Sequence, residues 1–281
     1  LSLDPYLTMV SVTAIPAQVN EYDVAGGLKG EPIEVTRAET SDLPVPAHAQ
    51  IVVEGEVPID DFLPTEGPFG EFAGYMGAVV ENSPYIRVKA VTYQRDPVFQ
   101  GTPPLAPPHE GTAMMSVGRS FAMLEQLRTA GITGIQNVCV TAASAYFNCV
   151  VSIKKSYPGH VRDVMGHVWG HPNLFCKHCI VVDEDIDPWN AYKVEWAIGT
   201  RVKAGRDIEI VKHGKSNLDP SSPRPHGGVR GAVESDLLGI DATRPVEAYE
   251  EMGEKFPASA DPSPELIERV RARWKEYGFK S

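Results

Sequence analysis

The chain is poor in cysteine, in long apolar runs and in positive charge, and each shortage excludes a class of protein. Four cysteines in 281 residues do not indicate a disulfide framework. No apolar run approaches the roughly 20 residues that a transmembrane helix needs. The net charge of −11 argues against nonspecific nucleic-acid binding, which needs a basic surface. We therefore expect a cytoplasmic protein with neither a membrane nor a nucleic-acid partner.

What the chain does have is the composition of a globular protein with many bends. Hydrophobic residues make up 42% and charged residues 22%, while glycines number 25 and prolines 24. A chain of this length holds one large domain or two ordinary ones. Its first 100 residues are predicted to be mainly β. Residues 32–36 and 49–55 are β-branched runs between glycine and proline, and residues 85–93 alternate apolar and polar side chains as a half-buried strand does.

Proline pairs within residues 103–108 interrupt this pattern, and helices and strands alternate after them, which favours an α/β layer. A mostly apolar stripe predicts a helix over residues 111–129; its members are Met114, Met115, Phe121, Leu124 and Leu127. Strands are predicted at 133–140, 147–154, 177–183 and 207–212, and helices at 159–169, 188–199 and 264–277.

Local signals refine the second half of this prediction. Asp187 and Ser263 are each followed by proline, so we expect them to cap the helices that begin at 188 and 264. Residues 213–240 are rich in glycine, proline and serine, which predicts a long loop.

The most informative segment reads Glu66-Gly67-Pro68-Phe69-Gly70-Glu71. The two glycines permit backbone angles that other residues resist, and the proline fixes its own φ. This combination predicts a stiff bend that holds two carboxylates in one pocket. Repulsion between paired carboxylates favours the protonated form of one of them, as a general acid at neutral pH requires. The alternative is an exposed turn with two solvated glutamates.

Together with Gly74-Tyr75, this segment resembles the core signature of the UbiD family of decarboxylases. Further stretches fit the family in the same order along the chain. They are residues 20–30, 42–47, 151–160, 196–201 and 239–243. Because these matches span nearly all 281 residues, the chain is identified as a member of that family.

The resemblance implies reversible, non-oxidative decarboxylation of an aromatic, heteroaromatic or α,β-unsaturated carboxylic acid. The implied cofactor is prenylated FMN, with which the substrate forms a covalent adduct, accompanied by Mn²⁺ or Mg²⁺ and by K⁺. A flavin prenyltransferase is the implied supplier of the cofactor, and CO2 is the second small-molecule partner. The fold implied is α+β. Residues 1–105 belong to a split-barrel flavin-binding domain, 106–130 are a linker helix, and 131–281 form an α/β C-terminal domain that makes a homo-oligomer.

The family uses an Arg-Glu-Glu catalytic set, whose glutamates match Glu66 and Glu71. We assign Glu71 as the acid–base and Glu66 as its partner in the network. Glu21 matches the glutamate that ligates the metal beside the cofactor phosphate, a role suited to a hard oxygen ligand. The remaining candidates are Gly67 and Pro68 for cofactor binding, and Met114 and Met115 for substrate contact.

Part of the family pattern has no counterpart here. The catalytic arginine and the asparagine and histidine that complete the metal site lie, in the family, on a long segment that precedes residues 20–22, whereas this chain opens at Leu1. We therefore expect the C-terminal portion of a longer enzyme, or one half of a split enzyme completed by a second chain. The alternative is a non-catalytic assembly subunit.

Two other clusters suggest metal sites. One contains His160, His167, His171, Cys176, His178 and Cys179. We expect the helix to end before His171, and no second Cys-x-x-Cys exists, so buried free cysteines are favoured over zinc. The other, Asp183, Asp185 and Asp187, has the spacing of a calcium loop, but Pro188 replaces its turn glycine. A solvated loop is therefore favoured.

Overall fold

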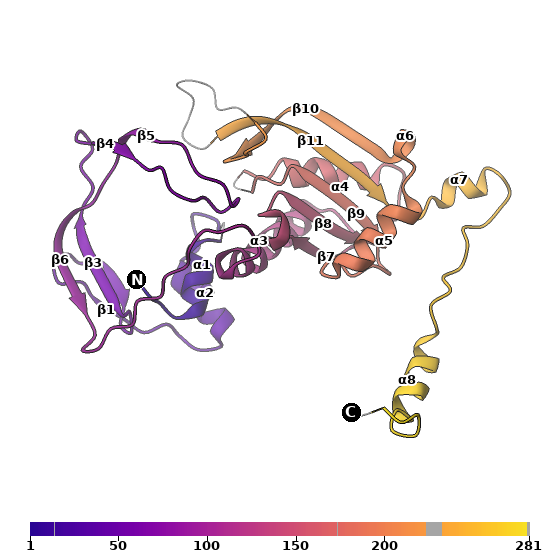
Figure 1. The fold of residues 1–281 in the computed structure, drawn as a ribbon, viewed down its shortest axis with the longest axis horizontal. Coiled ribbons are helices and arrows are strands. Elements are labelled where there is room, and N and C mark those ends of the chain that lie inside the picture. The colour runs from indigo at the N-terminus through magenta and orange to yellow at the C-terminus, as the bar shows by residue number, and fades with distance from the viewer. Residues whose placement is uncertain (14, 173, 223–231, 280–281) are drawn as a thin grey trace. The chain divides into compact units, whose positions relative to one another are not determined.

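The structure is a computed structural model that describes residues 1–13, 15–172, 174–222 and 232–279. The chain forms two compact units, residues 1–243 and residues 244–281. The fold is mixed α+β, as predicted (Figure 1). In chain order, the first unit contains α1 (Pro5–Ser11), α2 (Glu21–Lys29), β1 (Val35–Arg37), β2 (Pro44–Pro46), β3 (Ile51–Glu56), β4 (Leu63–Glu66), β5 (Val80–Ser83), β6 (Arg87–Tyr93), α3 (Glu110–Thr129), β7 (Ile135–Val140), the 3₁₀ turn η1 (Ala142–Ser144), β8 (Asn148–Ile153), α4 (His160–Trp169), β9 (His178–Asp183), α5 (Ala191–Arg201), α6 (Ala204–Asp207), β10 (Ile208–Asn217) and β11 (Ala232–Ala242).

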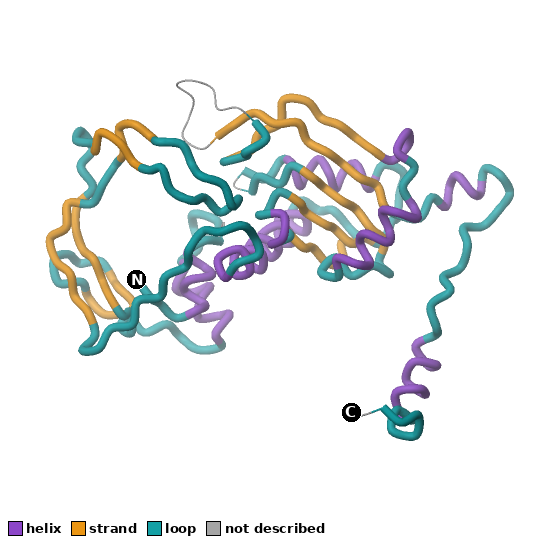
Figure 2. The backbone as a smooth tube through the Cα atoms, viewed as in Figure 1, coloured by secondary structure: helices purple, strands orange, loops and turns teal. Residues whose placement is uncertain are grey.

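A five-stranded sheet in the order β10-β11-β9-β8-β7 organises the second half of this unit (Figure 2). The three central strands β11, β9 and β8 run parallel, and the edge strands β10 and β7 are antiparallel to their neighbours. The central strands β8 and β9 are buried almost throughout, which explains their nearly continuous apolar sequences.

Helices cover both faces of this sheet. On one face, α3 and α4 contribute Met123, Leu127, Val164 and Val168 to the largest core cluster. On the other, α5 contributes Val194 and Ala197 to a second cluster with residues of β8, β9 and β11. This part of the chain therefore closes a core of its own.

The buried face of α3 differs from the predicted stripe. Phe121 is exposed, whereas Ser116 and Ser120 are buried. The Ser116 hydroxyl donates to the Val140 carbonyl at 2.5 Å, and the Val140 N–H donates to Ser120 Oγ at 2.8 Å. The Ser116 and Ser120 hydroxyls thus provide hydrogen-bond partners for the backbone of Val140 at the edge of β7. Counting apolar residues along the helix does not identify such buried polar positions. No helix of the described residues is both long and apolar enough to cross a membrane.

The prediction of a loop over residues 213–240 is wrong for residues 213–217 and 232–240, which are strand, and residues 223–231 lie outside the described residues. Much of this tract is sheet, because β10 extends to Asn217 and β11 begins at Ala232 and pairs with it antiparallel. The register shifts between Val211 and Gly214, so a bulge accommodates part of the glycine-containing sequence. The cap prediction at Asp187 is also wrong: Asn190 caps α5 by accepting from the Lys193 N–H.

The first 100 residues contain three separate two-stranded sheets, β1-β2, β3-β6 and β4-β5. The helices α1 and α2 were not predicted there, and they share a small cluster of Leu7, Val10 and Ala25. β6 occupies the predicted strand region but is not half-buried, since Val88 and Val91 are 53% and 51% exposed. The β-rich part thus carries apolar side chains that nothing among the described residues covers.

The second unit contains two short helices, α7 (Val246–Glu250) and α8 (Pro264–Ala272). The predicted cap of α8 is confirmed, because the Ser263 hydroxyl accepts from the Leu266 N–H and Pro264 occupies the first turn. The helix ends at Ala272, five residues earlier than predicted. No residue of either helix is buried.

Candidate active site

Glu66 and Glu71 lie on the same arm of one β-hairpin. Glu66 ends β4, opposite Val80 of β5, and the arms meet again at a bridge between Gly70 and Met76. Between the glutamates the chain bends at Gly67, whose φ of +83° favours glycine. The bend that the sequence predicts is therefore present, as part of a longer hairpin.

Glu71 begins the tight turn at the tip of this hairpin. Its N–H donates to the Tyr75 carbonyl at 2.9 Å, and its carbonyl accepts from the Gly74 N–H at 2.8 Å. The partly buried side chain lies over Gly77, where an added Cβ would be 3.0 Å from both Cγ and Oε1 of Glu71. The backbone and the absence of a side chain at residue 77 together position this carboxylate.

Glu66 has different surroundings. The Ser83 hydroxyl donates to its Oε2 at 2.6 Å, and Ser83 is fully buried although Glu66 is exposed. The two carboxylates are thus held separately, one by a serine on the opposite strand and one by the turn.

The hairpin is fixed to the chain segment that leads into α3. An added Cβ at Gly70 would lie 2.8 Å from the Pro104 carbonyl oxygen, and one at Gly74 would lie 2.7 Å from the Ala106 Cα. Only glycine permits this approach. Phe72, next to Glu71, packs its ring 5.5 Å from that of Tyr146, on the large core cluster.

The other sequence candidates lie on three elements. Glu21 is the exposed first residue of α2, a helix that Asn20 caps. Gly67 and Pro68 are exposed in the bend. On α3, Met114 is partly buried and Met115 packs against the large core cluster.

Metal coordination receives limited support from this chain alone. Among the described residues, no group of three or more histidine, cysteine, aspartate or glutamate side chains is arranged to hold a metal ion. All four cysteines are buried free thiols. Glu21 therefore offers a single carboxylate, and any further ligands would have to come from elsewhere.

Sequence reasoning missed Tyr146, whose ring contacts Phe72 of the hairpin, and Arg119, which lies over the Tyr146 ring. The Arg119 guanidinium carbon is 4.5 Å from the centre of the Tyr146 ring, and the Tyr146 hydroxyl donates to the Gly111 carbonyl at 3.2 Å. Burial lowers the pKa of Arg119 and raises that of Tyr146 to about 12. The one available signal was the placement of Arg119 four residues after Met115, on the same helix face.

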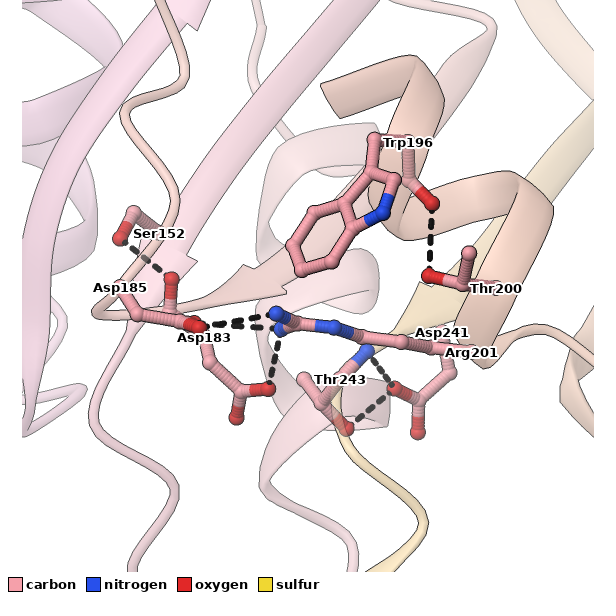
Figure 3. Close-up of polar contacts among 8 residues, drawn as sticks. All are labelled: Ser152, Asp183, Asp185, Trp196, Thr200, Arg201, Asp241 and Thr243. Carbon is pink, nitrogen blue, oxygen red and sulfur yellow. Dashed lines mark hydrogen bonds and ion pairs between the residues drawn. The ribbon is translucent and has the colours of Figure 1, made fainter. Parts of the chain in front are cut away.

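A fully buried arginine, Arg201, has a different environment (Figure 3). Arg201 extends between two carboxylates, with its Nη1 2.8 Å from Asp183 and its Nη2 2.8 Å from Asp185, and the Trp196 ring lies beside it. Asp183 and Arg201 are buried. The prediction of a solvated loop is therefore wrong for Asp183. These ion pairs join the end of β9 to α5, which is a structural role.

Comparisons with known proteins extend over most of the chain. Residues 1–107 match the profile of the 3-octaprenyl-4-hydroxybenzoate carboxy-lyase Rift-related domain, and residues 112–242 match that of the carboxy-lyase C-terminal domain. An uncharacterised protein of Synechocystis sp., sll0936, is 32% identical over 285 residues, which cover 99% of this chain and 54% of that protein. The chain thus spans about half the length of this curated relative.

Solved structures agree with this result. The UbiD-class enzyme HmfF from Pelotomaculum thermopropionicum, in complex with FMN, is 31% identical with a TM-score of 0.77, over 95% of this chain and 57% of that one. An evolved dimeric form of HmfF is in complex with prFMN. Vanillic acid decarboxylase (ShVdcCD) of Sedimentibacter hydroxybenzoicus, in closed form, is 28% identical with a TM-score of 0.78, over 98% of this chain and 56% of that one.

Proposed function

The chain belongs to the UbiD family of carboxy-lyases, and we propose that it provides the acid–base part of an enzyme that removes CO2 reversibly from an aromatic, heteroaromatic or α,β-unsaturated acid. The observation that carries this proposal is the Glu66–Glu71 hairpin. Both carboxylates are present, each with its own positioning contact, and the hairpin is anchored at Gly70, Phe72 and Gly74.

Loss of CO2 leaves an electron pair on the carbon that held the carboxylate, and that carbon must take up a proton. Glu71 in its acid form delivers this proton, and the resulting carboxylate regains one from solvent before the next turnover. In the carboxylation direction the same group removes the proton. Glu66, held by Ser83, pairs with the arginine of the catalytic set, which we place on the remainder of the enzyme.

Prenylated FMN, when bound, supplies the electron sink for this chemistry. The hairpin suits a flat aromatic group, because Phe69, Tyr75 and Met76 at its tip are 49%, 65% and 68% exposed. Together with Gly67 and Pro68 they present an apolar surface that a flavin ring would cover. Glu21 would contribute one oxygen ligand to Mn²⁺ or Mg²⁺ beside the cofactor phosphate.

A further polypeptide segment completes this site in our proposal. The β3–β6 ribbon has too few strands to be stable by itself and exposes Val88 and Val91. The remainder of the same enzyme, or a second chain, would cover it. Residues 131–281 would form the homo-oligomer, a role compatible with the evolved dimeric form of HmfF.

The decisive test is Glu71→Gln in the full-length enzyme loaded with prenylated FMN. We expect turnover to fall by about 100-fold or more, because a positioned acid contributes that much. Bound flavin, measured by absorbance, should stay at the wild-type level. Glu81→Gln, an exposed substitution on the opposite strand of the same hairpin, is the matched control and should retain turnover. Decarboxylation at the wild-type rate by the Glu71 variant would refute the assignment.

A further inference from the structure

Tyr146 has a backbone conformation that bulky residues rarely adopt. Its φ is +70°, and the φ of the preceding Ala145 is +51°. Such left-handed angles are unfavourable for residues with a Cβ, and they persist where the surrounding structure enforces them. Tyr146 is also one of the largest buried side chains of the core, with 2% of its surface exposed. A bulky core residue thus occupies a position that glycine would fill with less strain.

Hydrogen bonds in the connection between β7 and β8 enforce this conformation. The Tyr146 N–H donates to the Thr141 carbonyl at 3.1 Å, and the Thr141 N–H donates to the Asn148 carbonyl at 2.9 Å. The Ser144 hydroxyl donates to the Thr141 carbonyl at 3.0 Å and accepts from the Asn148 N–H at 3.0 Å. The turn leads directly into β8, a buried strand of the five-stranded sheet, so Tyr146 stands on a rigid base.

The left-handed residue turns two successive rings onto one neighbour. In a regular strand, consecutive side chains point to opposite faces. Here the rings of Tyr146 and Phe147 lie 5.5 Å and 6.1 Å from the ring of Phe72, at interplanar angles of 36° and 38°. Both distances are typical of interacting aromatic pairs. Tyr146 and Phe147 thus form an aromatic clamp on a side chain of the hairpin.

The clamp connects the hairpin to the beginning of α3. The Tyr146 hydroxyl donates to the Gly111 carbonyl at 3.2 Å, and burial raises the pKa of Tyr146 to about 12, so this donor keeps its proton at neutral pH. On the hairpin side, Phe72 directly follows Glu71, whose backbone closes the tip with two hydrogen bonds. Adjacent residues of such a turn move together, so a displaced Phe72 would displace the Glu71 carboxylate.

We propose that the aromatic clamp positions the group that transfers the proton. Tyr146 and Phe147 fix the ring of Phe72, and this ring keeps the adjacent Glu71 carboxylate in the place from which it protonates the product carbon. This inference rests on the proposed function. Tyr146 is a positioning residue, because it acts through Phe72. The strained backbone at Tyr146 is the means by which both rings contact the same side chain.

The kinetic test uses the full-length enzyme loaded with prenylated FMN, with benzoate, furan-2-carboxylate and cinnamate as probe acids. Tyr146→Leu should lower kcat by about 10- to 100-fold, the effect of shifting a reacting group by about 1 Å, and leave KM within about threefold of wild type. Tyr146→Phe keeps the ring contact and should restore kcat to within about threefold. Leu127→Ala, elsewhere in the same core cluster, should leave kcat within about twofold of wild type.

Hydrogen–deuterium exchange of the same variants, with no acid present, tests the clamp separately from the reaction. The amides of Glu71, Gly74 and Gly77 close the hairpin tip. They should exchange at least about 10-fold faster in Tyr146→Leu than in wild type, and at close to the wild-type rate in Tyr146→Phe. In a Glu71→Gln background, Tyr146→Leu should lower the residual kcat by less than about twofold, because the ring acts through Glu71.

Three results overturn the inference. The first is a kcat for Tyr146→Leu within about twofold of wild type, or a loss as large in Leu127→Ala. The second is an equal fold-loss in the wild-type and Glu71→Gln backgrounds, since the ring would then act independently of Glu71. The third is unchanged exchange at the hairpin tip, whether or not any probe acid is decarboxylated. Wild-type turnover by Glu71→Gln alone would instead refute the proposed function, and the role of the clamp in catalysis with it.

Discussion

The chain buries its apolar side chains in different ways in residues 112–242 and in residues 1–107. The first region surrounds a five-stranded sheet with helices on both faces, and its two core clusters are formed almost entirely by its own side chains. The second has three two-stranded sheets and one small buried cluster. Such ribbons are marginal in water. We therefore expect the β-rich region to depend on contacts from outside itself.

Glu66 and Glu71 lie in residues 1–107, the region with little core of its own. Their hairpin is nevertheless fixed to residues 112–242, the region with the large core. Phe72 packs onto the large core cluster, and Gly70 and Gly74 pack against the segment that leads into α3. The α/β region therefore positions the hairpin, whereas Phe69, Tyr75 and Met76 at its tip are exposed. Regions of low local stability are where binding elements commonly lie.

The largest expected difference between the two regions is in their response to side-chain truncation. Leu127 is fully buried in the large core cluster, and Leu127→Ala should lower the free energy of unfolding by about 2–5 kcal/mol. Val91→Ala, at an exposed position of β6, should change it by less than about 0.5 kcal/mol. Urea unfolding of both variants measures the contrast, and equal losses would contradict it.

A smaller effect is expected from acid. Burial holds the pKa of His171 at about 4 in the folded chain, below the ordinary 6.5, so the unfolded chain binds the proton first as pH falls. Stability is therefore complete above about pH 6.5 and decreases progressively between about 6.5 and 4. At pH 5 the loss relative to pH 7 should be about 2 kcal/mol.

Thermal unfolding at pH 7 and pH 5 checks this expectation. His171→Asn should reduce the difference between the two pH values, while His48→Asn, at an exposed site, serves as the control for loss of a histidine. An unchanged pH difference in the His171 variant would show that another group causes the acid sensitivity.

The sequence predicts the elements whose pattern is local and continuous. α3, β8, α4 and β9 appear within about two residues of their predicted bounds, because strands buried on both faces and long helices have strong apolar signals. β11 was missed because its partner β10 is distant in sequence and the intervening tract looks like a loop. α1 and α2 were missed because they are short, although Asn20 and Gly30 are ordinary capping residues for α2.

The same limit applies to the site. Glu66 and Glu71 are candidates from the sequence because their spacing and the glycines between them form a motif. The position of Arg119 could not be predicted, since a lone arginine on a helix is usually solvated or paired, whereas among the described residues its Nε is buried without a hydrogen-bond partner. The sequence likewise does not show that Arg201 pairs with Asp183 and Asp185, because the aspartates lie at and just after the end of β9 and the arginine ends α5.

Hydrogen–deuterium exchange on residues 1–281, compared with the full-length enzyme, tests the contrast between the two regions most directly. In the 281-residue chain the amides of β8 and β9 should exchange at least about 100-fold more slowly than those of β6, and in the full-length enzyme β6 should gain comparable protection. Slow exchange of β6 in the 281-residue chain alone would show that the β-rich region is stable without a covering segment, and would contradict a site completed by a further polypeptide.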